Sequence, residues 1–66
     1  MAFASLTIRG MQSEECVRTI RDALAELRGV ERIFVEMDHA TFSFDHTMVS
    51  FEEIRRVLTG LGYRVV

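Results

Sequence analysis

The chain begins with alternating apolar and polar side chains and then changes to a helical period. Residues 3–9 alternate in the manner of a half-buried strand, with one face made up of Ala4, Leu6 and Ile8. From residue 13 the apolar positions recur every three or four residues, at Val17, Ile20, Leu24 and Leu27. We expect Ser13 to cap this helix and Gly29 to end it. The pattern therefore predicts a strand followed by an amphipathic helix.

The second half of the chain repeats these patterns. Two alternating runs place Ile33, Val35 and Met37 on one face and Ala40, Phe42 and Phe44 on another, which indicates a hairpin joined around Asp38-His39. The spacing of Ser50 and Glu53 is that of a capping box at the start of a helix. We expect that helix to turn inward Phe51, Ile54, Leu58 and Leu61 and to stop at Gly60 and Gly62. Residues 63–66 are predicted to form a short closing strand.

The predicted order βαββαβ indicates an α+β fold of the ferredoxin-like type. Right-handed crossovers would place both helices on one face of a four-stranded antiparallel sheet. With 66 residues, the chain is expected to form one domain over residues 1–66. In this topology residues 11–16, 38–39 and 62–63 share one end of the molecule, and His46 lies at the other.

Composition excludes several classes of function. The net charge is −2 and the eight basic residues are scattered among ten acidic ones, so no basic stripe is available for nucleic acid. Phe42 and Phe44 share the face of Ala40 beneath the helices, which disfavours a base-stacking platform. A single cysteine forms no intrachain disulfide, and neither a leader nor a long apolar span is seen. We therefore expect a cytoplasmic domain that does not insert into a membrane.

Several motifs resemble those of one family over nearly the whole chain. They are Leu6-x-Ile8-x-Gly10-Met11, Cys16 at the start of the first helix, Leu27-x-Gly29-Val30, the strand positions Val35, Phe42 and Phe44-Asp45, and the late Gly62-Tyr63. Together they resemble the heavy-metal-associated domains of copper chaperones and of the amino-terminal arms of metal-transporting ATPases.

The resemblance implies a metal loop with one ligand missing. In that family the loop reads G-M-x-C-x-x-C, and its two thiolates bind copper(I) nearly linearly or bind a soft divalent ion such as zinc. Here the stretch GMQSEEC retains Cys16, whereas Ser13 occupies the position of the first cysteine. A hydroxyl is not a ligand for copper(I), because its pKa lies far above that of a thiol. Cys16 is thus the candidate primary ligand. The alternative is that Cys16 has only a structural role, as a small half-buried residue at the start of a helix.

Other residues at this end are weighed as ligands or as neighbours. His39 could add an imidazole to the thiolate, although a histidine in a tight turn usually has no ligand role. Met11 could offer a thioether, but packing beneath the loop is the favoured role. The site-adjacent residues are Glu14, Glu15 and Tyr63: the glutamates complement the helix dipole yet oppose a nearby thiolate, and the tyrosine offers packing or a hydrogen bond.

The leading hypothesis is a heavy-metal-associated domain that handles a soft metal, copper(I) first and zinc or another soft divalent ion second, through a one-cysteine loop. A second donor would come from another protomer in a metal-bridged homodimer, a partner such as a metal-transporting ATPase or another such domain, glutathione, or His39. We find no nucleophile with an attendant base and no carboxylate pair in a cleft, so we do not expect an enzyme.

Three alternatives stay open or are weighed against it. The chain could bind no metal and act as a protein-interaction or regulatory module, or Ser13 could be an engineered replacement of a cysteine. A small amino-acid-sensing domain of the same strand order would not explain Gly10-Met11 and Cys16.

Overall fold

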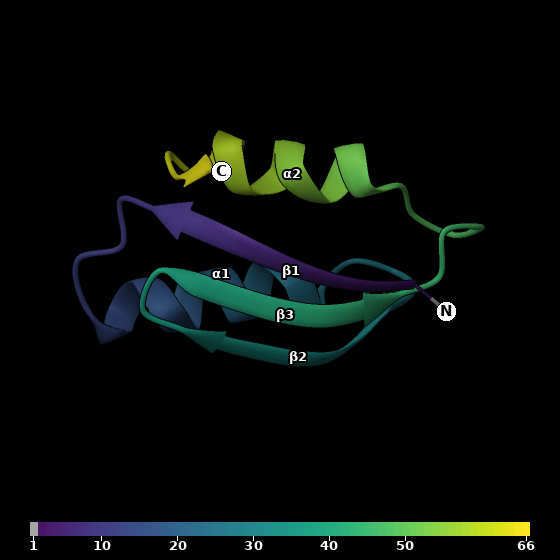
Figure 1. Ribbon diagram of the computed structural model, residues 1–66, viewed down its shortest axis with the longest axis horizontal. Helices are drawn as coiled ribbons and strands as arrows, with labels where there is room; N and C mark the ends of the chain where they lie inside the picture. The colour runs from purple at the N-terminus through teal and green to yellow at the C-terminus, as the bar shows by residue number, and fades with distance from the viewer. Residues whose placement is uncertain (1) are drawn as a thin grey trace.

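The computed structural model describes residues 2–66 and has the predicted order of elements (Figure 1). The elements are β1 (Ala2–Arg9), α1 (Glu14–Ala25), β2 (Val30–Glu36), β3 (His39–Phe44), α2 (Phe51–Gly60) and β4 (Arg64–Val65). The strands form an antiparallel sheet in the order β2-β3-β1-β4. The predicted ferredoxin-like sandwich is therefore confirmed.

The core lies between one face of the sheet and the two helices. The alternation of β1 buries its expected face, and β3 likewise buries Ala40, Phe42 and Phe44. The helices contribute Ile20 and Leu24 from α1 and the fully buried pair Ile54 and Leu58 from α2. These side chains hold both helices against the sheet, because burying each one contributes about 1.5–3 kcal/mol relative to leaving it exposed.

The two helix starts are built differently. At α2 the Ser50 hydroxyl oxygen accepts the Glu53 backbone N–H at 3.1 Å, so the predicted cap is confirmed. At α1 Ser13 has the extended backbone of a capping residue, but its side chain makes no capping hydrogen bond. The Cys16 N–H, a donor that the Ser13 hydroxyl could have bonded, donates instead to the carbonyl oxygen of Ser13 at 3.0 Å. The prediction of a side-chain cap at Ser13 is therefore wrong.

Helix α1 ends earlier than the sequence predicted. Its last residue is Ala25 rather than one beside Gly29, and the Leu27 N–H donates to the Leu24 carbonyl oxygen in a tightened final turn. Gly29, with φ +84°, then reverses the chain into β2, and its carbonyl oxygen accepts the Asp45 N–H at 2.8 Å. Gly29 thus shapes the connection rather than the helix end.

A β-bulge in β2 changes the register that simple alternation predicted. Pairing with β3 slips between Glu31 and Phe34, where Arg32 adopts φ +54°. The extra residue lets Val30 and Ile33 both lie half-buried, although they are three positions apart. Met37 was expected to share this buried face, but β2 ends at Glu36 and Met37 lies in the turn with 43% of its surface exposed.

Two expected core positions of the second helix are also corrected. Phe51 is 39% exposed and Leu61 is 44% exposed, whereas Ile54 and Leu58 are fully buried. Phe51 is the first residue of α2 and packs the edge of the core, 6.4 Å from the Phe44 ring centroid. Leu61 follows the last helical residue, so helical spacing no longer directs its side chain inward.

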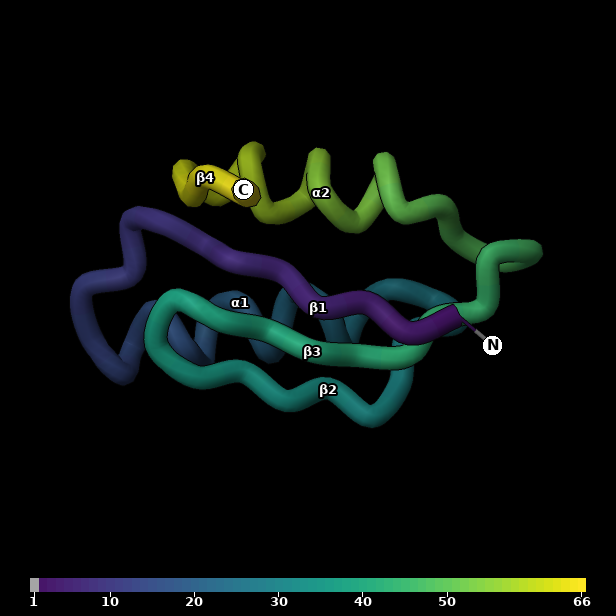
Figure 2. The backbone as a smooth tube through the Cα atoms, in the orientation of Figure 1, coloured from purple at the N-terminus to yellow at the C-terminus, as the bar shows by residue number. Residues whose placement is uncertain are grey.

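Three connections gather at one end of the sandwich, as the topology predicted. Figure 2 shows the segment after β1, the β2–β3 turn and the connection from α2 to β4 at one end. The loop that precedes α2 lies at the opposite end. The Ile8 N–H donates to the Asp38 carbonyl oxygen at 3.0 Å, which ties β1 to the hairpin. Among the described residues, no helix is long and apolar enough to cross a membrane.

Candidate metal centre

The segment joining β1 to α1 is anchored from below by Met11. This side chain is buried, and its sulfur accepts the Asp38 backbone N–H at 3.2 Å. Gly10 adopts φ +103° beside Tyr63, where an added Cβ would lie 3.7 Å from a ring carbon of the tyrosine. The loop is therefore held by the β2–β3 turn and by the residue preceding β4. Met11 lies where packing was expected, with its sulfur already engaged.

Cys16 lies in the first turn of α1, half-buried against the core, and is a free thiol. The pKa of the Cys16 thiol is lowered, first by the backbone N–H of Gln12 and then by the Tyr63 hydroxyl. Burial raises it, and Ser13 lowers it through both its backbone and its hydroxyl. The pKa of Tyr63 is raised in turn, chiefly by its hydrogen bond to Cys16. The site thus favours the thiolate, the form that binds metal.

The remaining residues of the loop are exposed. Ser13 faces solvent beside Cys16 and supplies a hydroxyl rather than a second sulfur. Glu14 and Glu15 form the acidic first turn of α1, where a carboxylate complements the positive end of the helix dipole. The sequence left the net effect on the Cys16 thiol open, and donors from Gln12 and Tyr63 decide it in favour of the thiolate.

His39 belongs to the correct end of the fold but to the other face of the sheet. Its neighbour Ala40 is buried beneath the helices, so the His39 side chain lies on the open face, and its Nε2 is 3.2 Å from the Ser5 hydroxyl oxygen. Ser5 lies four residues before the end of β1 at Arg9, where the metal loop begins. The imidazole of His39, which contacts Ser5, therefore points along the sheet and away from that loop. The structure does not bring His39 to Cys16. His46 is exposed in the loop at the opposite end.

The candidate site offers a metal ion one thiolate ligand, that of Cys16. Within residues 2–66 no group of three or more His, Cys, Asp or Glu residues is arranged to hold a metal ion. Cys16 supplies one thiolate, the type of donor that favours copper(I) over harder ions. A two-coordinate thiolate site would need one more sulfur from outside this loop.

Two backbone donors at the site were not found by sequence reasoning. The Gln12 N–H acts on the Cys16 sulfur, and the Asp38 N–H binds the Met11 sulfur. Backbone donors leave no signature in residue type. One indirect signal existed for Asp38, because aspartate tolerates the left-handed conformation, φ +66°, that this turn uses.

Comparison with known proteins places this loop in a family. Residues 5–64 match the model of the heavy-metal-associated domain. The chain is 38% identical over 64 residues to the "probable copper-exporting P-type ATPase" of Archaeoglobus fulgidus, covering 94% of this chain but only 8% of that protein. It is 31% identical over 62 residues to the copper chaperone CopZ of Staphylococcus epidermidis, covering 91% of each.

Solved structures agree with this match. The apo copper chaperone of Enterococcus hirae is 28% identical and superposes with a TM-score of 0.82, covering 92% of this chain and 93% of that one. The relatives matched over most of their length are chaperones rather than enzymes, in agreement with the sequence expectation. The βαββαβ sandwich, the glycine-methionine loop and the family match over residues 5–64 together show that this chain belongs to the heavy-metal-associated domain family.

Proposed function

We propose that this domain binds and passes on a soft metal ion, copper(I) before zinc or another soft divalent ion, through Cys16 as its single protein thiolate. The observation that carries the proposal is the position of Cys16. Its thiol lies in the first turn of α1, beside a loop held in place by Met11 and Tyr63, with local donors that favour the thiolate. The copper chaperones and ATPases among its relatives support the choice of metal.

The second donor comes from outside the chain. Ser13 offers a hydroxyl, and the His39 ring is turned toward Ser5, so neither completes a copper(I) site with Cys16. A second protomer, a cysteine of a metal-transporting ATPase or of another domain of the family, or glutathione would supply the missing sulfur. Each arrangement leaves the ion between two thiolates of different molecules, which suits transfer by exchange of one sulfur at a time. A thiolate also has to stay reduced, which suits the cytoplasm.

Copper(I) titration under anaerobic, reducing conditions tests the proposal. We expect amide shifts in residues 10–17 and at Tyr63, together with a metal-bridged dimer containing one copper(I) per two chains, measured by NMR and by light scattering. The Cys16→Ala variant should lose both responses. The Ser13→Cys variant should bind one copper(I) per monomer. A tight one-to-one monomeric complex that survives in Cys16→Ala would contradict the proposal.

A metal-free interaction module is the second candidate function. The absence of a second thiol in the loop and the exposed Glu14 and Glu15 favour it, because the carboxylates oppose a complex of anionic thiolates. This alternative expects no copper-dependent shift at Cys16 at any concentration below precipitation. The same titration therefore separates the two functions.

A further inference from the structure

The open face of the sheet, which the helices leave uncovered, carries two exposed aromatic side chains. Phe3 of β1 is 72% exposed and Phe34 of β2 is 60% exposed. In register, Phe3 pairs with Ser43 and Phe34 pairs with Thr41. Ser43 and Thr41 alternate in β3 with the fully buried Phe42, so all four paired side chains lie on the open face. The two rings thus flank a strand whose side chains between them are small.

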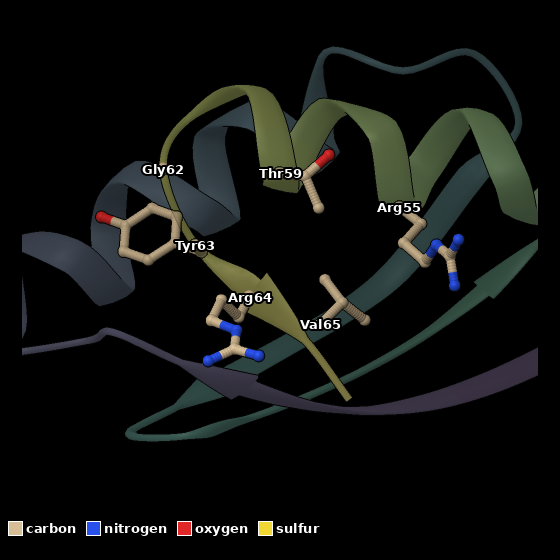
Figure 3. A pocket seen from close by; sticks show the side chains of 6 residues that line it. All are labelled: Arg55, Thr59, Gly62, Tyr63, Arg64 and Val65. Atoms are coloured by element: carbon tan, nitrogen blue, oxygen red, sulfur yellow. The ribbon is translucent and has the colours of Figure 1, made fainter.

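The charged residues of the open face are separated by sign. Glu31 and Glu36 lie exposed on β2, the strand at one edge of the sheet. Arg9 and Arg64 pair in register on β1 and β4, at the other edge. Figure 3 shows the Val65 side chain between β4 and α2 and the Arg64 side chain turned away from α2. The open face is therefore acidic along one edge and basic along the other.

These charges are not neutralised within the described chain. Among residues 2–66, neither Glu36 nor the two arginines Arg9 and Arg64 form a salt bridge. The arginines are like charges opposite one another on neighbouring strands, an arrangement that destabilises a sheet. A partner surface that brings acidic groups to the β1–β4 edge and basic groups to β2 would compensate both edges.

We propose that the open face is a self-association surface, on which a second copy of this chain packs face to face. A two-fold interface is self-complementary, because each residue contact occurs twice by symmetry. A two-fold axis parallel to the strands places β2 of each copy opposite β4 of the other, which joins the acidic edge to the basic edge. An axis perpendicular to the strands would instead place β2 opposite β2 and bring like charges together.

The strand register supports a specific charge contact in this arrangement. Glu36 lies in register with His39, and His39 lies in register with Thr7 of β1. Arg9, which pairs with Arg64, is two residues beyond Thr7 and so is the next side chain along the same face. Glu36 and Arg64 therefore lie near the same end of the sheet but at opposite edges. The dimer brings Glu36 of each copy to Arg64 of the other.

The area of the open face sets the strength of this dimer. The arrangement places β1 opposite β3 of the second copy, so Phe3 of one copy packs beside Phe34 of the other. Four strands about 4.8 Å apart, over the length of residues 3–9, make a face of roughly 450 Å². Burial of two such faces gives about 900 Å² in total, which lies at the weak end for protein interfaces. We expect a reversible dimer with a dissociation constant of roughly 0.1–1 mM.

This interface differs from a copper-bridged dimer, because Cys16 belongs to α1 on the helix side of the sheet. The test therefore uses the Cys16→Ala protein with a metal chelator, followed by sedimentation equilibrium and NMR from about 10 μM to about 2 mM. We expect a monomer–dimer equilibrium and shifts that grow with concentration in the strands but not in the helices. Isotope-filtered spectra of mixed labelled and unlabelled chains should show contacts between Phe3 and Phe34 of different copies. A monomer throughout this range, or shifts confined to helices and loops, would overturn the proposal.

Charge reversal tests the arrangement of the two copies. Glu36→Arg and Arg64→Glu should each weaken the dimer about tenfold, because both symmetric contacts then join like charges. An equimolar mixture of the two variants should recover the dimer, since each contact again joins an arginine to a glutamate. Glu26→Arg, an exposed change at the end of α1, is the matched control and should leave the dimer unchanged. A mixture no more dimeric than the separate variants would contradict the proposed interface.

Discussion

The Asp38 backbone N–H donates a hydrogen bond to the Met11 sulfur at 3.2 Å, which joins the β2–β3 turn to the candidate metal loop. Met11 is otherwise buried in the core, so a single side chain both fills space and satisfies a backbone donor from a distant part of the sequence. The conformation of the candidate metal loop therefore depends on the β2–β3 turn. We expect a substitution at Met11 to alter the environment of Cys16 as well.

Met11→Leu separates these two roles. Leucine preserves most of the volume but cannot accept the Asp38 N–H, so we expect a loss of about 1 kcal/mol in the free energy of unfolding. Met11→Ala adds a cavity and should cost about 2–5 kcal/mol. Urea unfolding measures both values, and hydrogen exchange at the Asp38 amide should quicken in both variants. Equal stability of wild type and Met11→Leu would show that the contact with sulfur contributes nothing.

Tyr63→Phe should raise the pKa of the Cys16 thiol toward its ordinary value. The tyrosine hydroxyl is the second-largest cause of the lowered pKa, after the Gln12 N–H, and phenylalanine removes it while keeping the ring beside Gly10. The midpoint of the pH dependence of iodoacetamide alkylation reports this pKa. The midpoint should lie lowest in wild type, higher in Tyr63→Phe and highest in the urea-unfolded chain.

The sign of the linkage at Cys16 follows from the direction of its pKa shift. Because the folded pKa is lowered, the folded protein holds the thiolate more readily than the unfolded chain does. The resulting stability is complete above the unfolded pKa of the thiol and is lost as pH falls through the folded pKa. An unchanged alkylation midpoint in Tyr63→Phe would contradict the claim that the Tyr63 hydroxyl lowers the pKa of Cys16.

Gly60 and Gly62 form a matched pair for testing backbone conformation. An added Cβ at either position meets no atom within 4 Å, yet only Gly62 has a left-handed backbone, with φ +98°. Gly62→Ala should therefore destabilise the fold by about 1–2 kcal/mol through backbone strain alone. Gly60→Ala, at the last residue of α2, should be neutral or stabilising by up to about 1 kcal/mol. Thermal unfolding of the two variants makes the comparison, and equal effects would contradict this reasoning.

The periodicity of the sequence predicted the fold because each strand and helix buries one face of a repeating pattern. It failed where the period was interrupted. The bulge at Arg32 depends on pairing with β3, and β2 ends at Glu36, so Met37 lies in the turn instead of on the buried face. Helical spacing also predicted that Phe51 and Leu61 point inward. Phe51 is the first residue of α2 and Leu61 follows its last residue, and both side chains are exposed.

The candidate site was predicted in outline by chain topology, which placed the Met11 loop, the hairpin and Tyr63 together. Side-chain direction was not predictable in the same way. The alternation of β3 places His39 on the open face once Ala40 is known to be buried, but its bond to Ser5 depends on the β1–β3 register. The donors to Cys16 and Met11 belong to the backbone, which residue type does not reveal.

Acidification should reveal a link between Asp45 and Thr47 at the end opposite the metal loop. The Thr47 hydroxyl donates to Asp45 Oδ1 at 2.6 Å and the Thr47 N–H donates to the same oxygen at 3.0 Å. These bonds lower the pKa of Asp45, the hydroxyl first and the backbone second, and the positive charge of His46 adds to the effect. The stability that they provide is complete above the unfolded pKa of about 4 and is lost as pH falls through the lower folded pKa.

Thr47→Val removes the hydroxyl and keeps the backbone donor, so the pKa of Asp45 should rise, as carboxyl ¹³C NMR would measure. The stability difference between wild type and Thr47→Val should be constant above pH ~5 and should shrink as the carboxylate of wild type is protonated. Thr19→Val is the matched control, because the Thr19 hydroxyl donates to the Glu15 carbonyl oxygen, which does not titrate. Its stability difference should not depend on pH over the same range. A Thr47→Val difference that also stays constant down to pH ~2 would mean that its hydroxyl acts on the folded loop without coupling to the charge of Asp45.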